Sequence, residues 1–327
     1  MKLAIAVLTS VIVSLCAATV HADPIQIRFS HTVSGKAPKG QMAKHFKKLV
    51  EERLKGRVEV KIYPRSLMYL DSEVVSALQE GKLELAAPAL SKLKRLTPKL
   101  QVFDLPFLFK DMAAVDRFQN SPQGKALLQA TVDQGVLGLG YLHNGMKQMS
   151  ANDPLRVPED ANGKRFRIMS SEVIKAQFEV LGAEGVKAAF PDVFNMLARG
   201  KVNGQENTWS NIYSAHLHRH QKYITESNHG LLDYMVITSA EFWQNLPADI
   251  RVELDQIMAE AIAFGNQVAA ANNDENRQSV IDFGHSEIVT LSDQQRAAWE
   301  LAMAPVWQQF ANEIGPDLIL AAKSYNQ

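Results

Sequence analysis

Short runs in which hydrophobic and polar residues alternate recur along the chain after residue 22 and predict β-strands. The segment IQIRFSHT (25–32) alternates in this way, with its large apolar side chains on one face at Ile25, Ile27 and Phe29. The same pattern predicts strands at 58–64, 136–145, 164–169 and 234–239. The segment 83–90 is almost wholly apolar, which is typical of a strand that is covered on both faces.

Helical spacing separates these strands. In GQMAKHFKKLVEERL (40–54), apolar residues recur every three or four positions, at Met42, Phe46, Leu49 and Val50. Asp71 is expected to cap a short helix that ends before Gly81. Further helices are predicted at 121–134, 171–181, 191–199 and 247–283. The last of these is long enough to run across two lobes.

The alternation of strands and helices predicts an α/β fold with largely parallel sheets. Without residues 1–22, 305 of the 327 residues remain. That length is close to the limit for a single hydrophobic core, so we expect two lobes. Because no stretch rich in Pro, Gly or Ser separates them, the lobes should be entwined.

The segment 1–22 predicts a cleaved signal peptide. Lys2 precedes an apolar run that ends in the small-residue pattern Val20-His21-Ala22. A membrane anchor is the competing interpretation, but no basic stop-transfer flank follows. Leu15 stands before Cys16 where a lipoprotein site requires a small residue. The exported chain is therefore expected to contain no cysteine and to be stable without disulfides.

The charge balance excludes some partners. Thirty-five basic and 35 acidic residues give a formal charge of 0, and removal of Lys2 with the signal peptide makes it −1. We therefore predict no nucleic-acid partner. Beyond residue 22 no apolar stretch approaches the length of a membrane span, so the exported chain is expected to be soluble.

Motifs for catalysis, metals and cofactors are weak. In HLHRH (216–220), only His216 and His220 would share a helix face, and no Glu has the spacing of a zinc protease. In GLGYLHNG (138–145) the third glycine of a dinucleotide fingerprint is misplaced, and no helix is expected to begin there. No G-x-S-x-G or Walker sequence occurs. We predict no enzyme activity, no metal and no cofactor, and an exported hydrolase that uses HLHRH is the alternative.

Two polar stretches are better candidates for a binding site. In GKRFRIMSS (163–171), Arg165 and Arg167 share the strand face opposite Phe166, and a solvated face is the competing interpretation. In KVNGQENTWSNIYS (201–214), a turn leads into hydrogen-bonding side chains beside Trp209. A polar loop with a helix cap would give the same pattern.

Together these stretches resemble the solute receptors of tripartite ATP-independent periplasmic (TRAP) transporters, and among them the DctP branch that binds C4-dicarboxylates. The resemblance covers nearly the whole chain after residue 22. The motifs that carry it are specific together, and no single one would suffice. These are FSHTVSGKAPKGQMAKHFKKLVEER, VFDLPFLFKDMAAVDRFQNSPQGKALL, LGYLHNGMKQMSAN, GKRFRIMSSEV, VNGQENTWSNIYS and QKYITESNHGLLDYMVITSAEFW.

The resemblance implies a periplasmic receptor whose two α/β lobes close on a ligand in the cleft between them. Strands cross between the lobes, and a long helix lies across both. Lobe I is expected at 23–145 with 235–275, and lobe II at 146–234 with 276–327. The receptor is expected to be a monomer that delivers its ligand to membrane permease subunits.

The resemblance also assigns site residues. Arg167 is the expected carboxylate ligand, because a guanidinium makes two parallel hydrogen bonds and stays charged when water is excluded. Asn207 matches the family asparagine. Lys147 is the second expected cation, for the far carboxylate, since a dianion in a dry cleft needs more than one.

Four further positions complete the expected site. Lys92 and His31 follow predicted strands, where open α/β sheets bind ligands, although a surface lysine and a buried imidazole are equally consistent. Trp209 and Phe190 are expected to form apolar walls, with core packing as the alternative. Ala89 stands where related receptors often carry a polar residue, so a contact to a ligand hydroxyl is expected to be missing.

The predicted ligand is succinate, malate or fumarate. Another small organic acid, such as a 2-oxo acid or a sugar acid, is the alternative ligand. A subunit that reports its ligand to a membrane kinase is the alternative role.

Overall fold

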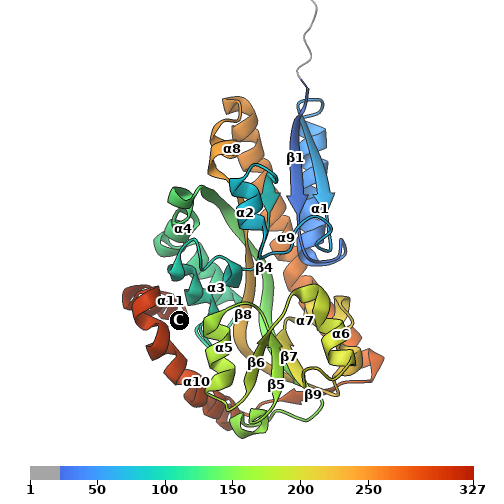
Figure 1. Cartoon of the computed structure of the whole chain (residues 1–327), viewed down its shortest axis with the longest axis vertical. Helices are drawn as coiled ribbons and strands as arrows, with labels where there is room; N and C mark the ends of the chain where they lie inside the picture. The colour runs from blue at the N-terminus through green and yellow to red at the C-terminus, as the bar shows by residue number, and fades with distance from the viewer. Residues whose placement is uncertain (1–22) are drawn as a thin grey trace, which may run out of the picture.

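The computed structural model describes residues 23–327. The predicted signal peptide (1–22), with Lys2 and Cys16, lies outside the described residues. Within the described part, nine strands form one sheet in the order β2-β1-β3-β8-β4-β7-β5-β6, and β9 pairs with β8 (Figure 1). The strands are β1 (Ile25–Ser30), β2 (Val58–Tyr63), β3 (Leu85–Ala86), β4 (Val136–Ala151), β5 (Arg165–Ile168), β6 (Glu184–Lys187), β7 (Gly204–Asn207), β8 (Tyr223–Ser239) and β9 (Glu287–Thr290).

Helices cover both faces of this sheet and connect its strands. The α-helices are α1 (Pro38–Arg53), α2 (Val74–Gln79), α3 (Met112–Gln119), α4 (Pro122–Gln129), α5 (Glu172–Glu179), α6 (Val193–Ala198), α7 (Trp209–Ser214), α8 (Ala240–Gln244), α9 (Ala248–Phe283), α10 (Asp293–Ile314) and α11 (Pro316–Ser324). The 3₁₀ turns are η1 (Leu90–Lys92), η2 (Pro98–Asp104), η3 (Val132–Gln134), η4 (Pro158–Ala161), η5 (Phe190–Asp192) and η6 (Leu217–His220).

The sheet combines two parallel groups. Strands β2, β1 and β3 run parallel to one another, and so do β6, β5 and β7. The antiparallel pair β4 and β8 joins the groups, because β3 pairs antiparallel with β8 and β7 pairs antiparallel with β4. The α/β class is confirmed, but the expectation of largely parallel sheets misses this antiparallel centre.

Strands β4 and β8 connect two lobes. They are 16 and 17 residues long and run from the part of Figure 1 that holds β1 and α1 to the part that holds β5, β6 and β7. The sequence predicted only 136–145 and 234–239, since polar residues interrupt the apolar pattern in the other half of each strand. The lobe boundaries given above stay predictions.

Helix α9 lies along both lobes. Its 36 residues extend about 54 Å, at the usual rise of an α-helix. Near its start Glu253 and Glu260 pair with Arg53 of α1, and further along Asn273 accepts from the backbone N–H of Ser210 in α7. The predicted helix over 247–283, and its position across both lobes, are therefore confirmed.

The predicted hydrophobic faces lie in the core. Ile27 and Phe29 of β1 are buried, and Phe29 packs edge-on against Phe46 of α1, with 6.3 Å between the ring centroids. In the other lobe, Phe166 of β5 stacks on Phe178 of α5 at 4.8 Å. The inward faces of β1 and β5 thus pack against the helices that follow them in sequence.

Some local predictions are wrong. Helix α2 begins at Val74 with Glu73 at its N-cap, so Asp71 does not cap it. Of the predicted strand 83–90, Leu85–Ala86 forms β3 and Ala89 makes a single bridge to Tyr234, after which the chain turns into η1. The predicted helix 121–134 is divided into α4 and η3. HLHRH forms no α-helix, because His216 adopts a left-handed backbone (φ 58°) and a 3₁₀ turn follows.

Candidate functional site

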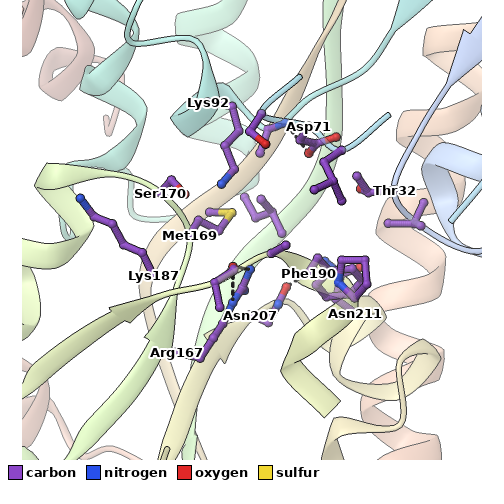
Figure 2. A pocket seen from close by; sticks show the side chains of 18 of the residues that line it. Thr32, Asp71, Lys92, Arg167, Met169, Ser170, Lys187, Phe190, Asn207 and Asn211 are labelled. Atoms are coloured by element: carbon purple, nitrogen blue, oxygen red, sulfur yellow. Dashed lines mark hydrogen bonds between the residues drawn. The ribbon is translucent and has the colours of Figure 1, made fainter. Parts of the chain in front are cut away.

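A cavity of about 220 Å³ lies where the carboxyl ends of the two parallel groups of strands face each other. From one lobe Thr32, Asp71 and Lys92 line it, and from the other Arg167, Phe190 and Asn207 (Figure 2). Ligands of open α/β sheets bind at this end of the strands, since backbone turns there leave space above the sheet. The cavity is therefore the candidate binding site.

Arg167 and Arg165 share a face of β5 but have different environments. Arg165 begins the strand at its rim, where its side chain is 49% exposed and pairs with Glu184 at 3.0 Å. Arg167 lies two residues closer to the cavity and is 2% exposed. Strand alternation alone could not tell which of the two arginines binds a ligand. The structure distinguishes them, because the carboxyl end of β5 is buried at the cavity and its start is exposed.

Backbone contacts fix the orientation of the Arg167 guanidinium. Its Nε and Nη2 donate to the carbonyl oxygen of Ala188 at 3.1 and 2.7 Å. Its Nη1 is buried and has no hydrogen-bond partner among the described residues. Since a guanidinium carries five N–H donors, a fork of Nη1 and Nη2 hydrogens remains for an anion. Burial lowers the pKa of Arg167 to about 10, although the charges of Glu206 and Asp192 act in the opposite direction.

Two asparagines lie beside this guanidinium on the cavity wall. Asn207 ends β7, and its Oδ1 accepts from Asn211 Nδ2 at 2.8 Å and from the N–H of Thr208 at 3.1 Å. Its amide oxygen is thus engaged, which leaves the Nδ2 hydrogens for a ligand acceptor. Asn211 also lines the cavity and follows Asn207 by one helical turn. That spacing is the signal by which the sequence could have added Asn211 to the expected site.

Lys92 supplies a second cation from the opposite lobe. It ends η1, and Figure 2 shows its side chain extending toward the strand that carries Arg167. Burial lowers the pKa of Lys92, and the charge of Asp71 opposes this shift. Lys187 also lines the cavity, but its Nζ pairs with Glu172. Besides Arg167, Lys92 is therefore the cation lining the cavity that has no ion pair within the described residues.

Three expected site residues are placed behind the cavity wall. Lys147 is 1% exposed and its Nζ pairs with Glu206. His31 is buried at the end of β1, edge-on to Phe29, while its neighbour Thr32 lines the cavity. Trp209 packs in a cluster with Ile212, Ile224 and Val280. The structure thus brings Arg167, Asn207, Lys92 and Phe190 together at the cavity, and places Lys147, His31 and Trp209 elsewhere.

Asp71 and Tyr234 line the cavity without having been expected there. Asp71 was assigned to a helix cap, and Tyr234 belongs to the part of β8 that was read as an ordinary strand. Both were missed because only the folded chain brings the loop before α2 and the middle of β8 to the same cavity.

The histidines of HLHRH do not converge on one point: the rings of His216 and His218 pack edge-on at 6.3 Å. His218 stacks on Tyr213, and His220 packs edge-on against Phe194. Within residues 23–327, no group of three or more His, Cys, Asp or Glu side chains is placed to hold a metal ion. Every helix in the same range is too short or too polar to cross a membrane.

Comparison with known proteins gives consistent results. The model of the family described as "Bacterial extracellular solute-binding protein, family 7" (DctP) matches residues 29–313. The "C4-dicarboxylate-binding periplasmic protein DctP" of Shewanella loihica is 54% identical over 306 residues, which cover 94% of this chain and 91% of that protein.

Two solved structures are similar along most of the chain. The TRAP periplasmic solute-binding protein of Shewanella oneidensis with bound succinate is 49% identical, has a TM-score of 0.92, and the match covers 93% of this chain and all of that one (100%). The one from Pseudomonas aeruginosa with bound L-malate is 44% identical, has a TM-score of 0.85, and the match covers 88% and 100% of the two chains.

Proposed function

Because this chain belongs to the DctP family, family 7 of the bacterial extracellular solute-binding proteins, we propose that it is a receptor for a C4-dicarboxylate. It binds succinate, malate or fumarate outside the cytoplasm and delivers the ligand to the membrane subunits of a TRAP transporter. The names of the related proteins, two of them with a four-carbon diacid bound, support this ligand class.

The observation that carries the proposal is the pair of cations on opposite walls of one cavity. Arg167 approaches from one lobe and Lys92 from the other. A diacid has two anionic ends, and burying both is favourable only if each meets a cation or several donors. A monoacid or a neutral sugar would leave one of these cations without a partner.

In the bound state the diacid bridges the lobes. The Nη1 and Nη2 hydrogens of Arg167, with Nδ2 of Asn207, hold one carboxylate, and Lys92 meets the other. Because the ligand contacts both lobes, it stabilises the closed arrangement. Closure also removes water, which strengthens each charged contact. Phe190 forms an apolar wall. Lys147, His31 and Trp209 lie behind the wall and do not contact the ligand.

We infer the remaining properties from family membership and the chain itself. The receptor is a monomer without catalytic activity or cofactor. It is exported to the periplasm by a signal peptide, residues 1–22, that is then removed. Mass spectrometry of the protein purified from the periplasm tests this cleavage directly.

A thermal-shift screen tests the function. Protein purified from the periplasm of cells that express the full chain is mixed with succinate, L-malate, fumarate, pyruvate, galactonate, glucose and putrescine. A ligand that binds only the folded state stabilises it by roughly 2.7 kcal/mol at a hundredfold excess over Kd. We expect the three C4 diacids to raise the melting temperature most. If glucose or putrescine raises it and the diacids do not, the proposed function is wrong.

Transport is tested separately. Proteoliposomes that hold the TRAP membrane subunits should take up labelled succinate only when this receptor is added. Binding without uptake would favour the alternative in which the receptor reports to a membrane kinase.

A further inference from the structure

The cavity proposed to bind a dianion also has a carboxylate in its wall. Asp71 lies in the loop between β2 and α2, on the same wall as Lys92 and Thr32 (Figure 2). Among the described residues that line the cavity, it carries the only acidic side chain. A negative charge at this position opposes the binding of any anion, so its presence needs a compensating contact.

The local structure holds this carboxylate in place. One oxygen, Oδ2, accepts from the N–H of Ala89 at 3.3 Å, directly before the turn that carries Lys92. No hydrogen bond from residues 23–327 reaches the other oxygen, Oδ1. Asp71 makes no cap to α2, whose N-cap is Glu73. The side chain therefore has one acceptor oxygen that is not engaged at the cavity.

A buried lysine, Lys39, lies behind the wall, and its charge interacts with that of Asp71. Lys39 is 1% exposed, its Nζ donates to the carbonyl oxygen of Ala87 at 2.8 Å and lies 3.6 Å from the centroid of the Tyr234 ring. Burial lowers the pKa of Lys39 to about 8, and the charge of Asp71 acts against this shift. Lys39 adds its positive charge to those of Arg167 and Lys92, so among the described residues the cations around the cavity outnumber its one carboxylate.

The unengaged oxygen restricts the chemistry of the ligand. A carboxylate oxygen only accepts hydrogen bonds, so once closure of the lobes excludes water Oδ1 needs a donor from the ligand. The carbon chains of succinate and fumarate carry no donor. A hydroxyl group on the chain does, and an ammonium group would too, but Lys39 and Lys92 already supply positive charge around Asp71. A neutral hydroxyl is the donor that fits both conditions.

We propose that Asp71 determines specificity within the diacids: its Oδ1 accepts a hydrogen bond from a ligand hydroxyl, so the receptor prefers a hydroxy-C4-dicarboxylate such as malate. This inference rests on the proposed function. It also revises the role of Ala89, which has no polar side chain but whose backbone N–H orients the carboxylate that reads the hydroxyl.

Isothermal titration calorimetry at pH 7.5 tests the inference with L-malate, succinate, fumarate and L-aspartate. A hydrogen bond to a charged group is worth roughly tenfold to a hundredfold in affinity. We expect the unaltered receptor to bind L-malate at least about tenfold more tightly than succinate or fumarate. Asp71→Ala should bring this ratio close to one, because malate loses its hydrogen bond and succinate no longer faces a negative charge.

The matched control is Glu73→Gln, which removes a carboxylate from the same segment but outside the cavity lining. It should leave the ratio unchanged. Asp71→Asn, which keeps the size of the side chain, provides a second variant if Asp71→Ala does not fold, and should lower the ratio by strengthening succinate binding.

Three results would overturn the inference while leaving the proposed function in place. They are equal affinity of the unaltered receptor for malate and succinate, a ratio that survives both Asp71 variants, and tightest binding of L-aspartate. If the unaltered receptor binds none of the three diacids, the proposed function fails and the inference fails with it.

Discussion

The guanidinium of Arg167 is held by the backbone carbonyl of Ala188, which accepts from both Nε and Nη2. Ala188 directly follows β6, the parallel neighbour of β5, so pairing of the two strands places this carbonyl beside the side chain. The arginine is therefore oriented before any ligand arrives. Binding then costs less side-chain entropy, which is the advantage of a preorganised site.

Replacing Arg167 should weaken diacid binding strongly. Arg167→Ala removes the partner of a buried carboxylate, and the expected loss is about 2–5 kcal/mol, a factor of roughly thirty to several thousand in Kd. Arg167→Lys should recover only part of this, because an ammonium lacks the planar fork. Calorimetry with succinate measures each variant.

Arg165→Ala is the matched control, since Arg165 shares the strand and the face but pairs with Glu184 in solvent. It should leave Kd within about threefold. Loss of binding in Arg165→Ala together with normal binding in Arg167→Ala would contradict the assignment of the carboxylate ligand.

Lys92 and Lys187 offer a second matched pair. Both line the cavity, but the ammonium of Lys187 pairs with Glu172. Lys92→Met should raise Kd for succinate roughly tenfold to a hundredfold, whereas Lys187→Met should change it by less than about threefold. Calorimetry at constant ionic strength compares the two variants. Equal effects on Kd would contradict the assignment of Lys92 as the second cation for the ligand.

Lys147 is expected to act on stability. Its ion pair with Glu206 is fully buried, and loss of one partner of such a pair costs about 3–5 kcal/mol. Lys147→Met should lower the free energy of unfolding in urea by this amount without ligand. The double variant Lys147→Met/Glu206→Gln should recover part of the loss. A stable Lys147→Met protein that fails to bind succinate would instead place Lys147 at the ligand.

The lobes should close on the ligand. Strands β4 and β8 carry register shifts at Gly138/Gly140, at His143/Gly145 and at Lys147/Met149, where fewer ladder bonds resist bending. Small-angle X-ray scattering should show a smaller radius of gyration with saturating succinate than without it. Arg167→Ala at the same succinate concentration should scatter like the ligand-free protein. An unchanged scattering curve for the unaltered receptor would argue against closure.

His31 should make the fold sensitive to acid. Burial, followed by the charge of Lys39, lowers the pKa of His31 from 6.5 to about 3. The neutral imidazole therefore contributes stability that is fully present above pH 6.5 and is lost as the pH falls toward 3, because the unfolded chain takes up the proton first. Each pH unit in this window should remove about 1.4 kcal/mol.

Urea denaturation at pH 4, 5, 6 and 7 measures this loss. His31→Gln, which does not titrate, should show a shallower decline than the unaltered protein. Parallel declines would mean that His31 is protonated in the folded state.

The site could be predicted in part. Resemblance selected Arg167 and Asn207, and the ends of predicted strands selected Lys92, all of which the structure brings to the cavity. Lys92 could be predicted from its place after a strand because ligands of this fold bind at the carboxyl ends of parallel strands. The role of Asp71 was not accessible in this way, because a Ser-containing turn before a helix is also where a helix cap occurs.

The sequence by itself determined several of the helices and strands and which of their faces are buried, as Phe29, Phe46 and Phe166 illustrate. It did so because burial of one face of a helix or strand leaves a periodic pattern within a few residues. Only the tertiary structure decided which charges meet a ligand and which meet each other. Lys147 and Glu206 are 59 positions apart and pair because β4 lies against β7, a relationship that no local pattern carries.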